Sequence, residues 1–180
     1  MTAADTAYPS CFVAALPRPV VPLAEICEVP PGEVGHRWFR TDYLHVTTHY
    51  LGWLSAAQVA AVQEVLAHGP PCPVRSLRLT GETDVVGPTD RRSLIAIIEP
   101  VTPLVEWRHQ VARALADVGL TAAEPFRPHL TIARVSPCDL PARTPTIEPL
   151  ELPLREVALC TGRTECDQLT HEAPLKGRDT

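Results

Sequence analysis

Phe126-Arg127-Pro128-His129-Leu130-Thr131-Ile132-Ala133-Arg134 is a segment whose pattern predicts a turn followed by a β-strand. Apolar Leu130 and Ile132 alternate with polar neighbours, and side chains two positions apart share one face of a strand. The imidazole of His129 and the hydroxyl of Thr131 are therefore expected to point into the same space, about 6–7 Å apart along the strand.

A second His-x-Thr sequence lies earlier in the chain, within a predicted strand over residues 43–50. The spacing alone is weak evidence, because about one such pair is expected by chance in a chain with this many histidines and threonines. Both pairs lie among alternating apolar residues, which strengthens the assignment. We expect the two strands to lie side by side and to surround one phosphate with two imidazoles and two hydroxyls, those of His45, Thr47, His129 and Thr131.

Length and composition predict one globular domain that spans residues 1–180. Apolar residues make up 45% of the chain, enough for an ordinary core, and no run of about 18 of them is present to span a membrane. The net charge of −5 argues against a protein that grips long duplex nucleic acid, but it allows a pocket for one terminal phosphate. We expect a monomer without a membrane partner.

The N-terminus and the cysteines predict a cytoplasmic protein. Residues 1–16 contain no Lys or Arg, so a secretory signal is not expected. The six cysteines form no Cys-x-x-Cys pair, and we expect free thiols in a reducing compartment. Cys160 and Cys166 lack basic neighbours that would activate a thiol, apart from Arg163, and are expected to be inert.

The whole pattern predicts an α+β domain with mainly antiparallel strands, because two helices are too few to supply one crossover for each strand. A capping box of Ser55 and Gln58 begins the first helix, and Thr102 caps the second with Pro103 at its first position. Gly52 is expected to end the first His-x-Thr strand. The other expected segments are strands at 11–16, 36–40, 74–80, 93–99, 129–135, 157–160 and 168–172, a polar link at 81–92 and a short helix at 19–28.

These motifs resemble those of the two-histidine phosphoesterase superfamily, and most of all its bacterial branch called 2'-5' RNA ligase or RNA 2',3'-cyclic phosphodiesterase. The resemblance implies two lobes related by a pseudo-twofold axis, with helices on the outside and an active-site cleft between the lobes. Thr48 stands where the family usually has an apolar residue. The similarity spans roughly residues 11–176 and rests on three segments: Cys11–Leu16, Leu44–Thr47 with Tyr50-Leu51-Gly52 behind it, and Phe126–Arg134. The closing Val157–Leu159 and Pro174-Leu175 also fit.

The resemblance also implies a chemistry, the metal-independent opening of a 2',3'-cyclic phosphate on an RNA end or nucleotide, with no cofactor. It implies His129 as the base that activates water and His45 as the acid for the leaving ribose oxygen, tasks that suit an imidazole pKa of about 6.5. Thr47 and Thr131 would bind phosphate oxygens. Arg134 would add a cationic contact, but strand alternation puts it on the opposite face from Thr131, so we expect it to reach across the strand end.

The sequence allows two interpretations for several side chains. His49 is expected on the same face as His45 and Thr47, so an alternative to acid–base catalysis is a metal ion held by His45, His49 and His129. Arg127 either contacts substrate or lies on the surface. Four aromatic residues either stack on a nucleobase or pack against the protein: Trp38, Tyr43, Tyr50 and Trp53.

Two other functions stay open. The substrate is either a 2',3'-cyclic phosphate or another small molecule of the same chemical kind, such as a 2'-5' linked oligonucleotide or a nucleotide of specialised metabolism. From a different class, a non-catalytic protein with the same fold would only bind a nucleotide phosphate. The presence of both histidines counts against such a binder, because binding alone needs neither an acid nor a base.

Overall fold

The computed structural model describes residues 7–18, 36–39, 44–88, 90–122, 125–135, 145–165 and 168–171. Over these residues it contains eight strands and two helices, and every strand pairing is antiparallel. The predicted α+β class is confirmed. The elements are β1 (Ala7–Pro17), β2 (His36–Trp38), β3 (Val46–Ser55), α2 (Ala56–His68), β4 (Ser76–Val86), β5 (Arg92–Ile98), α3 (Thr102–Asp117), β6 (His129–Val135), β7 (Leu150–Glu165) and β8 (Gln168–His171).

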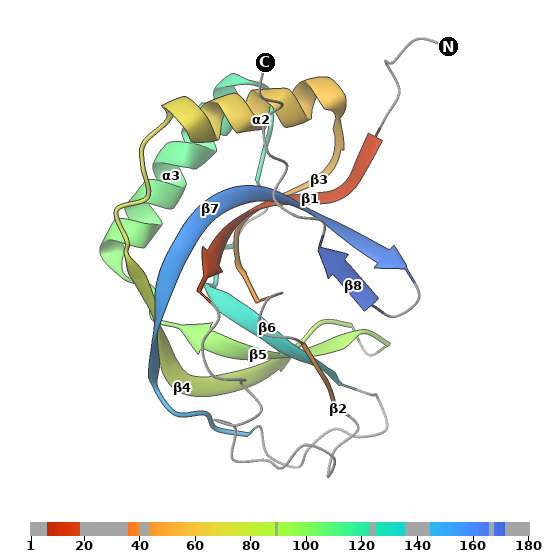
Figure 1. Cartoon of the computed structure of the whole chain (residues 1–180), viewed down its shortest axis with the longest axis vertical. Helices are drawn as coiled ribbons and strands as arrows, with labels where there is room; N and C mark the ends of the chain where they lie inside the picture. The colour runs from red at the N-terminus through yellow and green to blue at the C-terminus, as the bar shows by residue number, and fades with distance from the viewer. Residues whose placement is uncertain are drawn as a thin grey trace.

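A single strand order joins the two lobes: β2-β6-β5-β4-β7-β1-β3, with β8 beside β7. The long strand β7 is the link, because Leu150–Pro153 pair with β4 and Leu154–Thr161 pair with β1. Figure 1 shows β7 arching from β4 over β1. β3 and β6 contact each other although no hydrogen-bonded ladder joins them. The two His-x-Thr strands are thus neighbours in space through the curvature of the sheet, not through pairing.

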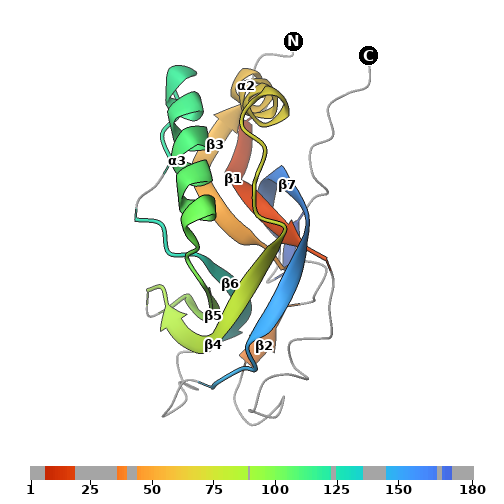
Figure 2. The ribbon, with the colours of Figure 1, turned by 90° about the vertical axis from the view of Figure 1, so that its left-hand side faces the viewer.

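Both helices lie on the outer side of the curved sheet (Figures 1 and 2). α2 begins with the predicted capping box, in which Ser55 and Gln58 each accept a hydrogen bond from the other's backbone N–H. The prediction that Thr102 caps α3 is wrong, since the cap residue is Val101 and makes no side-chain bond. Pro103 lies in the first turn, where a missing N–H has no intrahelical partner to lose. Neither helix has the length and apolar character that crossing a membrane requires.

Two strands run further than the sequence predicts, because glycines bend them without ending them. β3 continues through Gly52, with φ of 73°, and β4 continues through Gly81, with φ of 93°, across the first half of the predicted link 81–92. Glycine adopts positive φ without the steric penalty of a Cβ, so each strand bulges and then resumes pairing. The predicted pairing of 157–160 with 168–172 also shifts, since β8 pairs with Gly162–Glu165. The predicted helix at 19–28 lies outside the described residues.

Three cysteines lie within the described part of the chain, and all are free thiols as predicted: Cys11, Cys72 and Cys160. Burial raises the pKa of Cys160 to about 11, so this thiol stays protonated at neutral pH, as expected for an inert group. The other three, Cys27, Cys138 and Cys166, lie outside the described residues.

Replacing Gly81 by alanine is expected to destabilise the protein more than the same change at Gly52. Both residues have positive φ, but an added Cβ on Gly81 would lie 3.0 Å from the carbonyl oxygen of Ile147, whereas nothing lies within 4 Å at Gly52. We expect Gly52→Ala to lower the free energy of unfolding by about 1 kcal/mol and Gly81→Ala by roughly 2 kcal/mol or more. Urea unfolding measures both, and equal losses would contradict the close packing at Gly81.

Candidate active site

A cavity of about 220 Å³ opens between the lobes, and both His-x-Thr segments line it. The first segment contributes His45, Thr47 and Tyr50, and the second contributes Thr131 and Arg134. The sequence had not singled out the remaining lining residues as part of a site: Ser10, Phe12, Phe39, Ser93 and Gly162.

A β-bulge in β3 decides which of its side chains face the cavity. Thr47 pairs with Ala14 and His49 pairs with Val13, so Thr48 is an extra residue between them. Tyr50, three residues after Thr47, thereby returns to the cavity face, while His49 turns away and is fully buried. The prediction that His49 shares a face with His45 and Thr47 is therefore wrong, because it assumed unbroken alternation.

β6 contains a bulge at the equivalent place. Thr131 pairs with Ile95 and Ala133 pairs with Leu94, which leaves Ile132 as the extra residue. Arg134 consequently lies on the same face as Thr131, and both line the cavity. The prediction that Arg134 faces away and reaches across the strand end is wrong for the same physical reason. Each strand thus has the order histidine, threonine, bulge and a third cavity residue, which is Tyr50 in one strand and Arg134 in the other.

Buried polar contacts hold the β3 bulge against α3. The Nε2–H of His49 donates to the carbonyl of Arg108 at 2.9 Å, and the Nε–H of Arg108 donates to the carbonyl of Thr48 at 3.0 Å. The Thr48 hydroxyl lies 3.0 Å from Nδ1 of His49 and 3.1 Å from the carbonyl oxygen of Val13. The ring of His49 also meets Trp107 edge-on. Thr48 and His49 are thus part of the packing between strand and helix.

The position of His49 also argues against the alternative in which His45, His49 and His129 hold a metal ion. His49 contacts α3 on the outer side of β3, so it does not join His45 and His129 in one set of ligands. Within the described ranges, no three His, Cys, Asp or Glu side chains are grouped in a way that could hold a metal ion.

His45 lies just before β3, and its ring stacks on Phe12 with centroids 4.8 Å apart and an interplanar angle of 27°. Phe12 belongs to β1 and is itself buried. The stack fixes the plane of the imidazole against a rigid strand, and both residues line the cavity.

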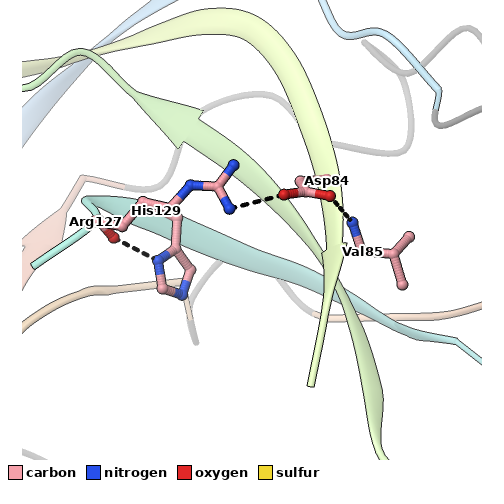
Figure 3. A network of polar contacts seen from close by, with 4 residues as sticks. All are labelled: Asp84, Val85, Arg127 and His129. Atoms are coloured by element: carbon pink, nitrogen blue, oxygen red, sulfur yellow. Dashed lines mark hydrogen bonds and ion pairs between the residues drawn. The ribbon is translucent and has the colours of Figure 1, made fainter. Parts of the chain in front are cut away.

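A backbone carbonyl orients His129, as Figure 3 shows. Its Nδ1 lies 2.7 Å from the carbonyl oxygen of Arg127, and a carbonyl can only accept, so Nδ1 carries the proton and Nε2 the lone pair of the neutral ring.

The side chain of Arg127 forms an ion pair on the surface, with Nη1 2.7 Å from Oδ2 of Asp84. The hydrogen bond from Arg127 lowers the pKa of Asp84 from its ordinary value. His129 precedes Thr131 by two residues but is not itself among the residues that line the cavity.

Arg134 has two fixed contacts at the cavity wall. Its Nη1 donates to the hydroxyl of Ser93 at 2.6 Å, and its guanidinium lies 6.0 Å from the ring centre of Phe39. Burial, and then the neighbouring charge of Arg91, lower the pKa of Arg134 from its ordinary value. Ser93 stands opposite Arg134 in the β5–β6 register, a relation that the sequence reveals only when the strand order is known.

The aromatic residues considered for stacking on a nucleobase lie in different places in the structure. Tyr50 lines the cavity, which places it where it can meet a ligand. Trp53 is 71% exposed and lies outside the cavity lining. Tyr43 and the side chain of Trp38 lie outside the described residues.

Comparison with known proteins gives both a sequence match and a fold match. The family model "LigT like Phosphoesterase" matches residues 96–161, which include the second His-x-Thr. No curated protein sequence matches the chain. Escherichia coli LigT in its apo form is similar in structure, with a TM-score of 0.67 and 20% identity over 95% of this chain and 96% of that one. The protein TT0787 of Thermus thermophilus gives a TM-score of 0.70 and 20% identity over 91% of this chain and 93% of that one.

A further solved structure is E. coli LigT complexed with 3'-AMP, with a TM-score of 0.66 and 20% identity over 94% of this chain and 96% of that one. At these identities the structures establish the fold, and the family model supplies the sequence link. The resemblance to two-histidine phosphoesterases is thereby confirmed, together with the two-lobed architecture.

Replacement of His49 by alanine is expected to act on stability. The side chain is fully buried and forms a hydrogen bond with α3. Its loss therefore leaves a cavity, and the carbonyl of Arg108 loses its hydrogen-bond donor. We expect the free energy of unfolding to fall by about 2–4 kcal/mol. His68→Ala is the matched control, because His68 is 77% exposed and pairs with Glu64 on the helix surface, a contact worth less than about 0.5 kcal/mol. Similar values for the two variants in thermal or urea unfolding would contradict this role.

Proposed function

We propose that this chain, whose sequence and fold both match LigT-like phosphoesterases, is a metal-independent phosphodiesterase that opens 2',3'-cyclic phosphates of RNA ends or nucleotides to 2'-phosphomonoesters. The observation that carries the proposal is the shared cavity, which is lined by His45 and Thr47 from one lobe and by Thr131 and Arg134 from the other. Hydroxyl and guanidinium donors around a small concave site suit an anionic group such as a phosphate.

The size and surroundings of the cavity favour a terminal or small substrate. About 220 Å³ accommodates a reacting phosphate and its sugar, but not a length of RNA. The net charge of −5 likewise offers no broad cationic surface for a nucleic-acid backbone. Binding of 3'-AMP by E. coli LigT supports a nucleotide as the ligand. We propose a cytoplasmic enzyme that acts as a monomer.

Hydrolysis needs a base for the attacking water and an acid for the leaving oxygen, on opposite sides of phosphorus. We assign the base to His129, because its Nδ1–H is committed to the carbonyl of Arg127 and leaves the Nε2 lone pair to take a proton from water. Water oxygen bonds to phosphorus, the bond from phosphorus to O3' breaks, and protonated His45 gives its proton to O3'. The product is a 2'-phosphomonoester, and the starting state is restored when His129 releases the proton that it took from water and His45 takes up a proton from solvent.

The other assigned residues bind the anion. Thr47 and Thr131 lie two residues after the two histidines and present hydroxyl donors for the non-bridging oxygens, where charge builds as water attacks. Arg134, held by Ser93, adds a cation at the same wall. Since these groups are fixed by strands and bulges before the substrate arrives, little reorganisation is needed during the reaction.

Substitution of either histidine tests the proposal. His45→Ala and His129→Ala are each expected to lower kcat/KM for a 2',3'-cyclic nucleotide by about 10²–10⁴, the usual contribution of a general acid or base. His109→Ala is the control, since His109 lies on the exposed side of α3 outside the cavity. Wild-type turnover is expected to persist in excess chelator and to yield only the 2'-phosphate.

Three results would overturn the assignment. Near-normal turnover of either histidine variant would remove that residue from catalysis. Loss of wild-type activity in chelator would point to a metal-dependent reaction. Nucleotide binding without turnover between pH 5 and pH 8, measured by calorimetry and product chromatography together, would identify a non-catalytic binder instead.

A further inference from the structure

Ser10 has a backbone conformation that is unusual for its residue type. Its φ is 52°, and within the described ranges it is the single non-glycine residue with positive φ. This left-handed conformation costs an L-residue about 1–2 kcal/mol, because Cβ approaches the following carbonyl oxygen. The residue lies where the β1–β3 ladder is interrupted, between the pairs made by Tyr8 and Cys11. Strain of this kind persists in proteins mainly where the surrounding site uses it.

Ser10 lines the cavity at the end occupied by His45. It faces Gly162 of β7, where an added Cβ would lie 3.6 Å from Cβ of Ser10 and 3.9 Å from the ring of Phe12. Phe12 in turn stacks on His45. Ser10, Gly162 and Phe12 therefore form one wall, and the absence of a side chain at Gly162 leaves space in front of the serine.

The hydroxyl of Ser10 is available to a ligand. Its side chain is half-buried, and it makes no hydrogen bond with another described residue. At the other wall, by contrast, the hydroxyl of Ser93 already accepts a bond from Arg134. The cavity thus has a cationic wall suited to phosphate and an uncharged wall with an open hydroxyl.

We infer that Ser10 is a specificity-determining residue whose hydroxyl hydrogen-bonds a polar group of the nucleoside, and that its strained backbone aims the hydroxyl into the cavity. The inference rests on the proposed function, in which His45 protonates the leaving ribose oxygen and the nucleoside therefore lies at the His45 end. An uncharged hydroxyl, both donor and acceptor, suits a sugar hydroxyl or base edge there, while the cation at Arg134 suits the phosphate.

Two substrates separate a nucleoside contact from a phosphate contact. One is 2',3'-cyclic AMP, and the other is ethylene phosphate, a five-membered cyclic phosphate without a nucleoside. Ser10→Ala removes the hydroxyl and is expected to lower kcat/KM for 2',3'-cyclic AMP by about three- to tenfold, the value of one neutral hydrogen bond. Turnover of ethylene phosphate is expected to stay unchanged.

Ser10→Gly separates the strain from the hydroxyl. Glycine accepts positive φ, so this variant is expected to raise Tm by about 2–4 °C while it loses the same activity toward 2',3'-cyclic AMP as Ser10→Ala. A residue with a merely structural role would lose stability and activity together. Greater stability with selectively lower activity is the signature of strain maintained for binding.

The outcomes distinguish this inference from the proposed function. If wild-type protein turns over neither substrate, the proposed function fails, and Ser10 is then tested by calorimetric titration with 2'-AMP and inorganic phosphate. A three- to tenfold weaker affinity of Ser10→Ala for 2'-AMP alone would still support the nucleoside contact. If wild-type protein is active, equal losses on both substrates, no loss on either, or a lower Tm in Ser10→Gly would each overturn the inference.

Discussion

One extra residue in each His-x-Thr strand controls what the cavity contains. In a regular strand the residue three places after a threonine faces the opposite side, which would direct Tyr50 and Arg134 away from the site. The bulges at Thr48 and Ile132 reverse that parity and return both side chains to the cavity. A bulge interrupts the ladder, and at Thr48 the interrupted strand is held by buried contacts with Arg108 of α3.

The two halves of the site share a backbone plan but differ in chemistry. The third cavity residue is an uncharged phenol at Tyr50 and a guanidinium at Arg134. The two histidines also differ in how they are held, because an aromatic stack fixes His45 and a carbonyl hydrogen bond fixes His129. In the reaction proposed above, the same residue type acts as the acid on one side and as the base on the other, because the neighbours of the two histidines differ.

The sequence was sufficient for the fold class and for most element positions, because these depend on local signals. The capping box at Ser55 and the strand over 129–135 are examples, and both appear where expected. The bulge at Ile132 also had a local trace, two successive apolar residues at Ile132 and Ala133. The bulge in β3 had none, since Thr48 and His49 are polar and their burial depends on partners in α3.

The remaining site residues depend on long-range register. Ser93 faces Arg134 only because β5 pairs with β6, and Gly162 faces Ser10 only because β7 pairs with β1. No local pattern around the His-x-Thr motifs predicts either pair of neighbours. Gly52 misled the prediction for a related reason, because a glycine that ends a strand and a glycine that bends one look the same in the local sequence.

The most direct test of the central claim is a crystal structure of the protein with uridine vanadate, a mimic of the five-coordinate phosphorus formed during cyclic phosphate opening. We expect the vanadate in the cavity between the lobes, with the His45 and His129 rings on opposite sides of it and the Thr47 and Thr131 hydroxyls donating to its oxygens. Vanadate bound away from the cavity, or in contact with only one of the two imidazoles, would contradict the convergence of the two bulged strands on one anion.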